Sequence, residues 1–258
     1  MNTQNNQENI FDESLLKCRQ KRAKAQGFVS FLHDKVILDL KDRLNEQGQG
    51  FPKVSIIGPF AKYWGRNLPF KLFNCYEDAQ ILPIKFNSSD LIISAIYLHS
   101  VNDPIARLVQ MRNGLKEGGI LFAYAFGENS LYELRKSFES ADCENSGEGL
   151  PRVNPTVDVP TFGSLLRRAG FNYCVSDKIS YVIEYDDPKE LFFDIRGMGE
   201  TNAMRERSRR PLQKKVLRDA LNFYRKNFAS VNSKDKYQAT FDIVCLTGWN
   251  NKPNQLSG

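Results

Sequence analysis

Apolar positions along the chain follow two patterns, one typical of amphipathic helices and one typical of strands. From Ser14 to about Gln47, apolar residues recur mostly at spacings of three and four, which predicts helix, and Gly48 and Gly50 end this segment. Short apolar runs and one alternating segment predict strands instead. The strands are expected at 54–58, 71–76, 90–98, 119–127, 173–185 and 238–249.

Helical patterns separate most of these strands. One helix begins at Asp103-Pro104 and ends at Gly118 or Gly119, and others are expected at 130–141, 161–171, 188–199 and 212–228. Buried strands alternating with helices predict an α/β fold whose mainly parallel sheet is covered on both faces. The last strand follows the last helix and the strand 173–185, which predicts an antiparallel addition at the sheet edge.

Length and composition bound the function. The chain has 258 residues, 41% of them hydrophobic and 26% charged, which suits one sizeable α/β domain or a domain with an appendage. No apolar run approaches the roughly 18 residues of a membrane span. The polar, acidic N-terminus lacks the features of a secretory signal. Five scattered cysteines without CxxC spacing favour a reducing, cytoplasmic setting, and two histidines leave little room for a metal site.

The charge pattern permits an acidic partner. The net charge is +6, with basic and acidic residues interspersed, so it does not by itself indicate nucleic acid. The segment RGMGETNAMRERSRRP at 196–211 combines glycines with arginines that include Arg205 and Arg207. We expect this loop to cover a cleft and hold a substrate or partner. No aromatic residues interleave its arginines, so nucleic-acid binding is not expected.

Several segments together resemble one family. They are FDESLLKCRQKRA, DLIISAIYLHSVNDP, LKEGGILFAYAFGENSLYELR, FGSLLRRAGF, DDPKELFFDIRGMGETNA and ATFDIVCLTGW, within residues 11 to 250. They resemble the class I methyltransferase family that holds the malonyl-carrier-protein O-methyltransferases. Within that family, the resemblance is strongest to bacterial proteins related to a mitochondrial complex I assembly factor, which is described as an arginine hydroxylase. The resemblance implies a Rossmann-like, seven-stranded sheet and S-adenosylmethionine as cofactor.

The resemblance also implies roles for particular residues. Gly58 would start the cofactor loop, and Asp78 would lie beside the adenine. His99 and Asn102 would follow the strand 90–98 next to the methyl-transfer site, and Glu128 would close the strand 119–127. Ligands of open α/β sheets bind at the carboxyl ends of the strands, and imidazole can act as a base near neutral pH. Structural roles stay open: a plain turn at Gly58, a cap at Asp78, a core histidine at His99.

The chain departs from the family pattern in three places. Pro59, Phe60 and Ala61 follow Gly58 where the family has a glycine-rich loop, although close backbone approach to a ligand favours glycine. Only 19 residues separate Gly58 from Asp78, whereas one βαβ unit takes roughly 30 residues. A helix and a strand that would supply a ribose-binding carboxylate are therefore expected to be missing. Ser100 stands where relatives often have tryptophan.

These observations predict a shortened methyltransferase fold with four segments: a disordered tail at 1–12, a helical extension at 13–50, a methyltransferase-like domain at 51–250 and a tail at 251–258. The expected function is that of an S-adenosylmethionine-dependent methyltransferase, with cofactor binding impaired by the altered loop. The alternative is a pseudoenzyme that binds a respiratory complex I subunit as an assembly factor. Arginine hydroxylation is a third hypothesis, resting on the related assembly factor alone.

Overall fold

The computed structural model describes residues 9–231, 233 and 235–250. Contacts between residues divide the chain into two compact units. The first unit comprises Met1–Val29, Leu131–Asn154 and Val182–Thr240, and the second comprises Ser30–Ser130, Pro155–Tyr181 and Phe241–Gly258. The predicted tail 251–258 lies outside the described residues.

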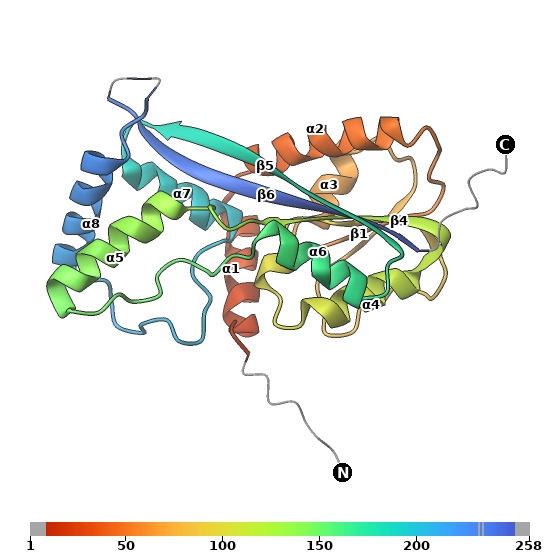
Figure 1. Ribbon diagram of the computed structural model, residues 1–258, viewed down its shortest axis with the longest axis horizontal. Coiled ribbons are helices and arrows are strands. Elements are labelled where there is room, and N and C mark those ends of the chain that lie inside the picture. Colours follow the sequence, from red (N-terminus) through yellow and green to blue (C-terminus); the bar gives the residue numbers. More distant parts are fainter. Residues whose placement is uncertain (1–8, 232, 234, 251–258) are drawn as a thin grey trace, which may run out of the picture. The chain divides into compact units, whose positions relative to one another are not determined.

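The strands form one sheet that is mainly parallel (Figure 1). β1 pairs in parallel with β2 and β3, β3 pairs in parallel with β4, and β4 pairs antiparallel with β6. The order is β2-β1-β3-β4-β6-β5, so the antiparallel part lies at one side of the sheet, as predicted. The strands are β1 (Val54–Ile57), β2 (Phe73–Tyr76), β3 (Ser89–Ser94), β4 (Leu115–Phe126), β5 (Tyr173–Tyr185) and β6 (Tyr237–Asn250).

The first half of the sheet is shortened, as the spacing predicted. The described sheet has six strands rather than the seven that the resemblance implied. Between β1 and β2 there is one helix, α3 (Ala61–Asn67), and β2 then pairs directly with β1 and ends the sheet. The short connection leaves room for one helix of seven residues and one strand of four, which corrects the expected strand number.

Both units contain helices, and four of those described begin at an aspartate cap. In the second unit these are α2 (Phe31–Glu46), α3, α4 (Pro104–Gly114), α6 (Val159–Arg168) and the short 3₁₀ helix η1 (Leu98–Ser100). In the first unit they are α1 (Glu13–Gln26), α5 (Tyr132–Ser146), α7 (Pro188–Met198) and α8 (Lys214–Asn227). Aspartate side chains accept a backbone N–H at the start of α1, α4, α6 and α7, which satisfies a donor that the helix itself cannot pair.

The N-terminal part of the chain is more ordered than its polar composition suggested. Residues 1–8 of the predicted disordered tail lie outside the described residues, but Phe11 is buried and bridges to Met204. Asp12 accepts the Leu15 N–H, so the predicted tail does not extend to Phe11 and Asp12. The segment predicted as one helical extension forms α1 and α2, with Gly27 between them at φ +99°. The boundaries at 13, 51 and 251 stay predictions.

Among the helices of the described ranges, none combines the length and the apolar character that a membrane crossing needs.

We predict that Gly65→Ala destabilises the protein by about 1–3 kcal/mol, because α3 packs onto β2 through this glycine. A Cβ at Gly65 would lie 2.2 Å from the Cε2 atom of Phe73 and 2.7 Å from its Cδ2 atom. This clash should outweigh the roughly 1 kcal/mol that alanine gains over glycine in a helix. Urea unfolding measures the change, and Gly50→Ala, with no atom within 4 Å of the added Cβ, is the control. Unchanged stability of Gly65→Ala would contradict this packing.

Candidate functional site

The candidate site lies at the carboxyl ends of the parallel strands in the second unit. The register places Ile57 opposite Tyr76 on one side and opposite Ser94 on the other. Gly58 follows Ile57 at φ +136°, and its N–H donates to the Tyr76 carbonyl oxygen over 3.0 Å. This positive φ explains the glycine, because residues with a side chain rarely adopt it.

The segment after β3 packs tightly against Gly58. A Cβ at this glycine would lie 3.1 Å from the Cδ1 atom of Tyr97 and 3.2 Å from the carbonyl oxygen of Ala95. Ile96 has φ +48°, an uncommon conformation for a β-branched residue that indicates local backbone strain. Tyr97 is only 2% exposed, and burial raises the pKa of its hydroxyl well above the ordinary value. The chain's own tyrosine thus occupies the space beside the loop glycine.

Aromatic side chains from α2 and α3 fill the volume behind the loop. Phe60 and Trp64 are buried, and the indole Nε1–H of Trp64 donates to Nδ1 of His33 over 2.8 Å. The His33 ring meets Phe60 edge-on, with 5.4 Å between ring centroids. Burial lowers the pKa of His33 to about 3, which keeps the imidazole neutral and able to accept this bond. The sequence pattern gave no sign of this pairing, because the two residues lie on different helices.

Asp78 forms an ion pair with an arginine of α4. Its Oδ1 atom lies 2.8 Å from Nε of Arg107, and Nη1 of Arg107 also donates to the Gln80 carbonyl oxygen over 2.7 Å. Arg107 is 8% exposed, so its charge is balanced within the protein. The sequence did not indicate a role for Arg107, because this residue lies among the regularly spaced apolar residues of a predicted helix. The adenine contact expected for Asp78 stays a prediction.

The fold brings the other predicted site residues to the same edge of the sheet. His99 lies in η1 after β3, is 5% exposed, and accepts the Phe126 N–H at Nδ1 over 3.3 Å. Asn102 follows η1 and is half-buried. Glu128 follows β4, is exposed, and accepts the Thr156 hydroxyl at its carbonyl oxygen over 3.0 Å. Gly58 follows β1 and Asp78 lies two residues after β2 at this edge, and the roles of all five residues stay predictions.

Arg205 and Arg207 belong to the first unit and bind its N-terminal segment. The Arg205 N–H donates to the Ile10 carbonyl oxygen over 2.9 Å. Nη1 of Arg207 donates to the Met204 carbonyl oxygen over 2.6 Å, and its Nη2 atom lies 3.4 Å from Asp12. Both arginines therefore have structural contacts, and their role toward a partner stays a prediction.

Asp242 on β6 is a buried carboxylate that sequence reasoning missed. It is 1% exposed and accepts hydrogen bonds from Ser180 Oγ over 2.6 Å, Lys178 Nζ over 2.9 Å and Asn129 Nδ2 over 3.1 Å. Burial raises the pKa of this carboxyl, but these donors outweigh burial, so the net shift is downward. The sequence feature that could have indicated this buried carboxylate is a single acidic residue within the largely apolar predicted strand 238–249. Asp242 fixes the loop that carries Glu128.

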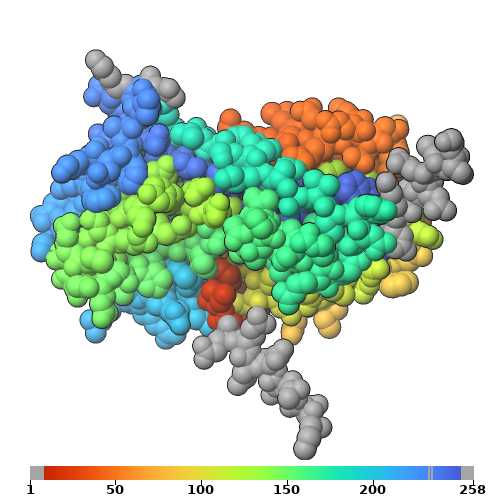
Figure 2. Space-filling view, viewed as in Figure 1, coloured from red at the N-terminus to blue at the C-terminus, as the bar shows by residue number. Residues whose placement is uncertain are grey.

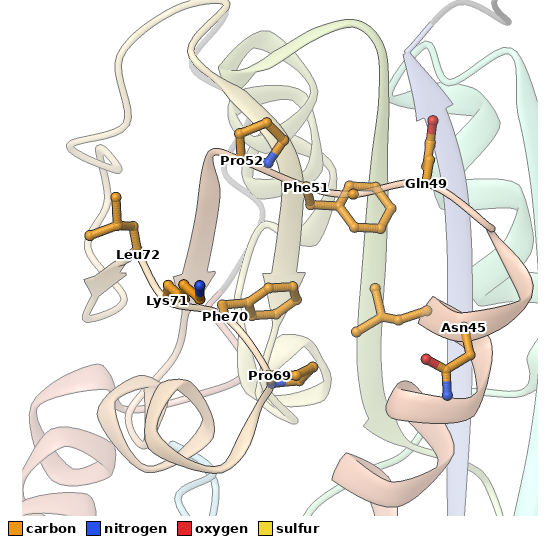
Figure 3. Close-up of a pocket in the computed structure, with 10 residues that line it drawn as sticks. Asn45, Gln49, Phe51, Pro52, Pro69, Phe70, Lys71 and Leu72 are labelled. Carbon is orange, nitrogen blue, oxygen red and sulfur yellow. The ribbon is translucent and has the colours of Figure 1, made fainter.

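A groove of about 650 Å³ opens elsewhere in the second unit (Figure 3). Residues before β1, residues before β2 and the end of α2 line it, so it lies at the amino ends of these strands. This groove therefore does not coincide with the candidate site at the carboxyl ends. Its lining residues are Leu44, Asn45, Gln49, Gly50, Phe51, Pro52, Pro69, Phe70, Lys71 and Leu72.

Comparison with known proteins identifies the family, although no family model matches the chain. The mouse (Mus musculus) protein named arginine-hydroxylase NDUFAF5, mitochondrial, is 30% identical over 268 positions, covering 93% of this chain and 77% of the mouse protein. A malonyl-[acyl-carrier protein] O-methyltransferase of Xylella fastidiosa is 34% identical over 132 residues, covering 51% of this chain and 43% of that protein. The chain belongs to the S-adenosylmethionine-dependent methyltransferase family that includes these proteins.

Two further comparisons concern the shortened half and the solved structures. The mouse alignment spans 268 positions but takes in 93% of 258 residues, about 240, so roughly 28 aligned positions have no counterpart in this chain. The Bacillus subtilis YcgJ structure is 11% identical, covers 78% of this chain and 92% of its own, and has a TM-score of 0.46, too low to carry the assignment.

We predict that His33 makes stability fall with pH below about 6.5. The pKa of His33 is about 3 in the folded protein and 6.5 ordinarily, so the unfolded chain binds an extra proton between these values. Stability should therefore be lost as pH falls through this window, by up to about 1.4 kcal/mol per pH unit. His33→Gln does not titrate and keeps an acceptor for Trp64, so its stability should fall less between pH 6.5 and 4.5 in urea unfolding. Equal pH dependence of the two proteins would refute the prediction.

Proposed function

We propose that this chain is a binding protein built on a methyltransferase fold, which acts without bound S-adenosylmethionine in the assembly of a respiratory complex I. The observation that supports this proposal is the closed edge at Gly58. Tyr97 packs against this glycine, and buried Phe60 and Trp64 fill the loop behind it. This packing supports the proposal that the chain's own side chains take the place of the cofactor.

The residues at this edge do not fit the cofactor that the family implies. Pro59 offers no backbone N–H to a ligand, and Pro59, Phe60 and Ala61 stand where the family has a glycine-rich loop. Asp78 is already paired with Arg107. Glu77, exposed directly after β2, is a weaker candidate for a contact with a ribose. We therefore assign no step to S-adenosylmethionine.

The proposed partner and location follow from the relatives and the cysteines. The resemblance to an assembly factor supports a complex I subunit as partner, and the charge pattern gives no support for nucleic acid. All five cysteines are free thiols, and two of them, Cys18 and Cys143, are exposed. Free exposed thiols suit a reducing compartment, so we place the protein in the cytoplasm.

Methyl transfer is the second candidate, favoured by the position of His99. The imidazole lies after β3, held by the Phe126 N–H, at the edge where the family carries out its chemistry. In that case the protein would mainly position an acceptor for attack, with His99 as an optional base. Arginine hydroxylation, the activity in the relatives' name, stays a third hypothesis. Among the described residues no group of three or more His, Cys, Asp or Glu side chains could hold a metal ion.

A calorimetric titration separates the first two candidates. We expect no heat of binding from S-adenosylmethionine or S-adenosylhomocysteine up to about 1 mM, a ligand range that detects even weak binding. Circular dichroism on the same sample must show a folded protein. Binding with micromolar affinity would overturn the cofactor-free proposal and favour methyl transfer.

A complementation experiment tests the assembly role. In cells that make this protein, its deletion should lower the amount of assembled complex I on native gels. Wild type and Glu77→Gln should restore complex I equally, because the proposed role does not use a cofactor carboxylate. Unchanged complex I after deletion would refute the assembly role. Failure of a folded Glu77→Gln protein alone would point to a cofactor-dependent activity.

A further inference from the structure

The outer edge of β2 is open in the described sheet. β2 pairs with β1 on one side and is the terminal strand of the order. The Tyr76 carbonyl oxygen accepts a bond from Gly58, so it faces the β1 side. Backbone groups alternate sides along a strand, so those of Phe73 and Cys75 point outward. An outward row of this kind is a template for another strand.

Large apolar side chains are exposed directly before β2 and in the segment that follows it. Leu72, directly before β2, is 77% exposed, Ile81 is 80% exposed, and Phe86 is 79% exposed. These are three of the four most exposed large apolar side chains of the described residues, the other being Val231. Single exposed apolar residues are ordinary, so a contact surface is indicated here by Leu72, which adjoins β2 and lines the groove described above.

The edge continues into the groove at the amino end of β2. Leu72 and Lys71 line that groove together with Phe70 and Phe51 (Figure 3). An extended segment lying along β2 would therefore meet a hollow of about 650 Å³ at one end of the strand. Backbone pairing along the edge and an apolar side chain in the groove would act together.

The charges beside β2 select the kind of segment. Lys62 and Arg66 on α3 are exposed and act electrostatically on the Cys75 thiol, whose pKa burial raises and these two cations lower. Lys71 is exposed immediately before the strand. Two copies of this edge would bring like charges together, which opposes self-pairing. An acidic segment would be attracted instead.

We propose that the outer edge of β2 binds an extended segment of alternating apolar and acidic residues from a partner protein, which adds a strand to the shortened sheet. The inference rests on the binding role proposed above and gives that role a surface. The strand that the shortened chain lacks would thus be supplied by the partner, with its acidic side chains facing Lys62, Arg66 and Lys71.

A labelled peptide tests the proposal directly. The probe is a fluorescein-labelled peptide of seven residues in which valine and glutamate alternate, and its binding to the full chain is followed by fluorescence anisotropy. We expect saturable binding and slower amide exchange at Phe73 and Cys75. The same peptide with N-methyl groups on alternate amides should bind at least about tenfold more weakly, because it cannot complete the ladder.

Surface variants locate the site. Leu72→Ser, at a highly exposed position, should weaken binding about tenfold without affecting folding, as loss of one well-placed apolar anchor does. Lys62→Glu with Lys71→Glu should weaken it further and remove its dependence on salt. Val175→Ser, at an exposed position on the other terminal strand β5, is the matched control and should leave binding unchanged.

Three results would overturn the proposal. They are absence of saturable binding up to about 1 mM peptide, equal binding of the N-methylated peptide, and a dimer in sedimentation velocity that Leu72→Ser dissociates. The last result would mean that a second copy covers the edge. Peptide binding together with S-adenosylmethionine binding would refute only the cofactor-free function. Failure of the peptide without cofactor binding would refute only the β2 site.

Discussion

The direct pairing of β2 with β1 determines where the sheet ends and how the loop after β1 packs. One short helix connects the two strands, and Gly65 lets that helix lie against Phe73. The sheet therefore ends one strand after β1. The same short connection carries Phe60 and Trp64 into the core beside His33, so the loop that would hold a cofactor becomes part of the packing. The packed loop after β1 and the terminal position of β2 in the sheet thus have one physical origin.

The opposite side of the sheet is braced by paired charges. Arg43 of α2 makes two hydrogen bonds to Asp177 of β5, at 2.8 and 2.7 Å, and one to Asp39 at 2.7 Å. The Tyr124 hydroxyl donates to Asp39 over 3.0 Å, which ties β4 into the same network. Burial raises the pKa of Cys245 to about 12, so this thiol stays neutral beside these charges. These charges are partly exposed, and each of them is paired within the network.

The segments that resemble the family and the altered loop after Gly58 differ in how they are packed. Asp242 and its donors fix the loop after β4, and His99 is held by the backbone of Phe126, so the scaffold of the methyl-transfer edge is intact. At Gly58 the scaffold is instead closed by Tyr97. A protein that keeps this frame, with Tyr97 packed against Gly58, is suited to the proposed role of binding through its surface. The proposed assembly role and the proposed binding at the edge of β2 both use this surface.

The sequence by itself determined the class of fold, because buried parallel strands need continuous apolar runs and helices need three- and four-residue spacing. It also determined that the first half is short, since 19 residues between Gly58 and Asp78 cannot hold a further helix and strand. Only the tertiary structure decided the partners of these residues. Contacts between distant segments, such as Asp78 with Arg107 or His33 with Trp64, leave no periodic signal. Whether a glycine meets a ligand or a tyrosine depends on which side chain packs against it, and packing is set by the whole fold.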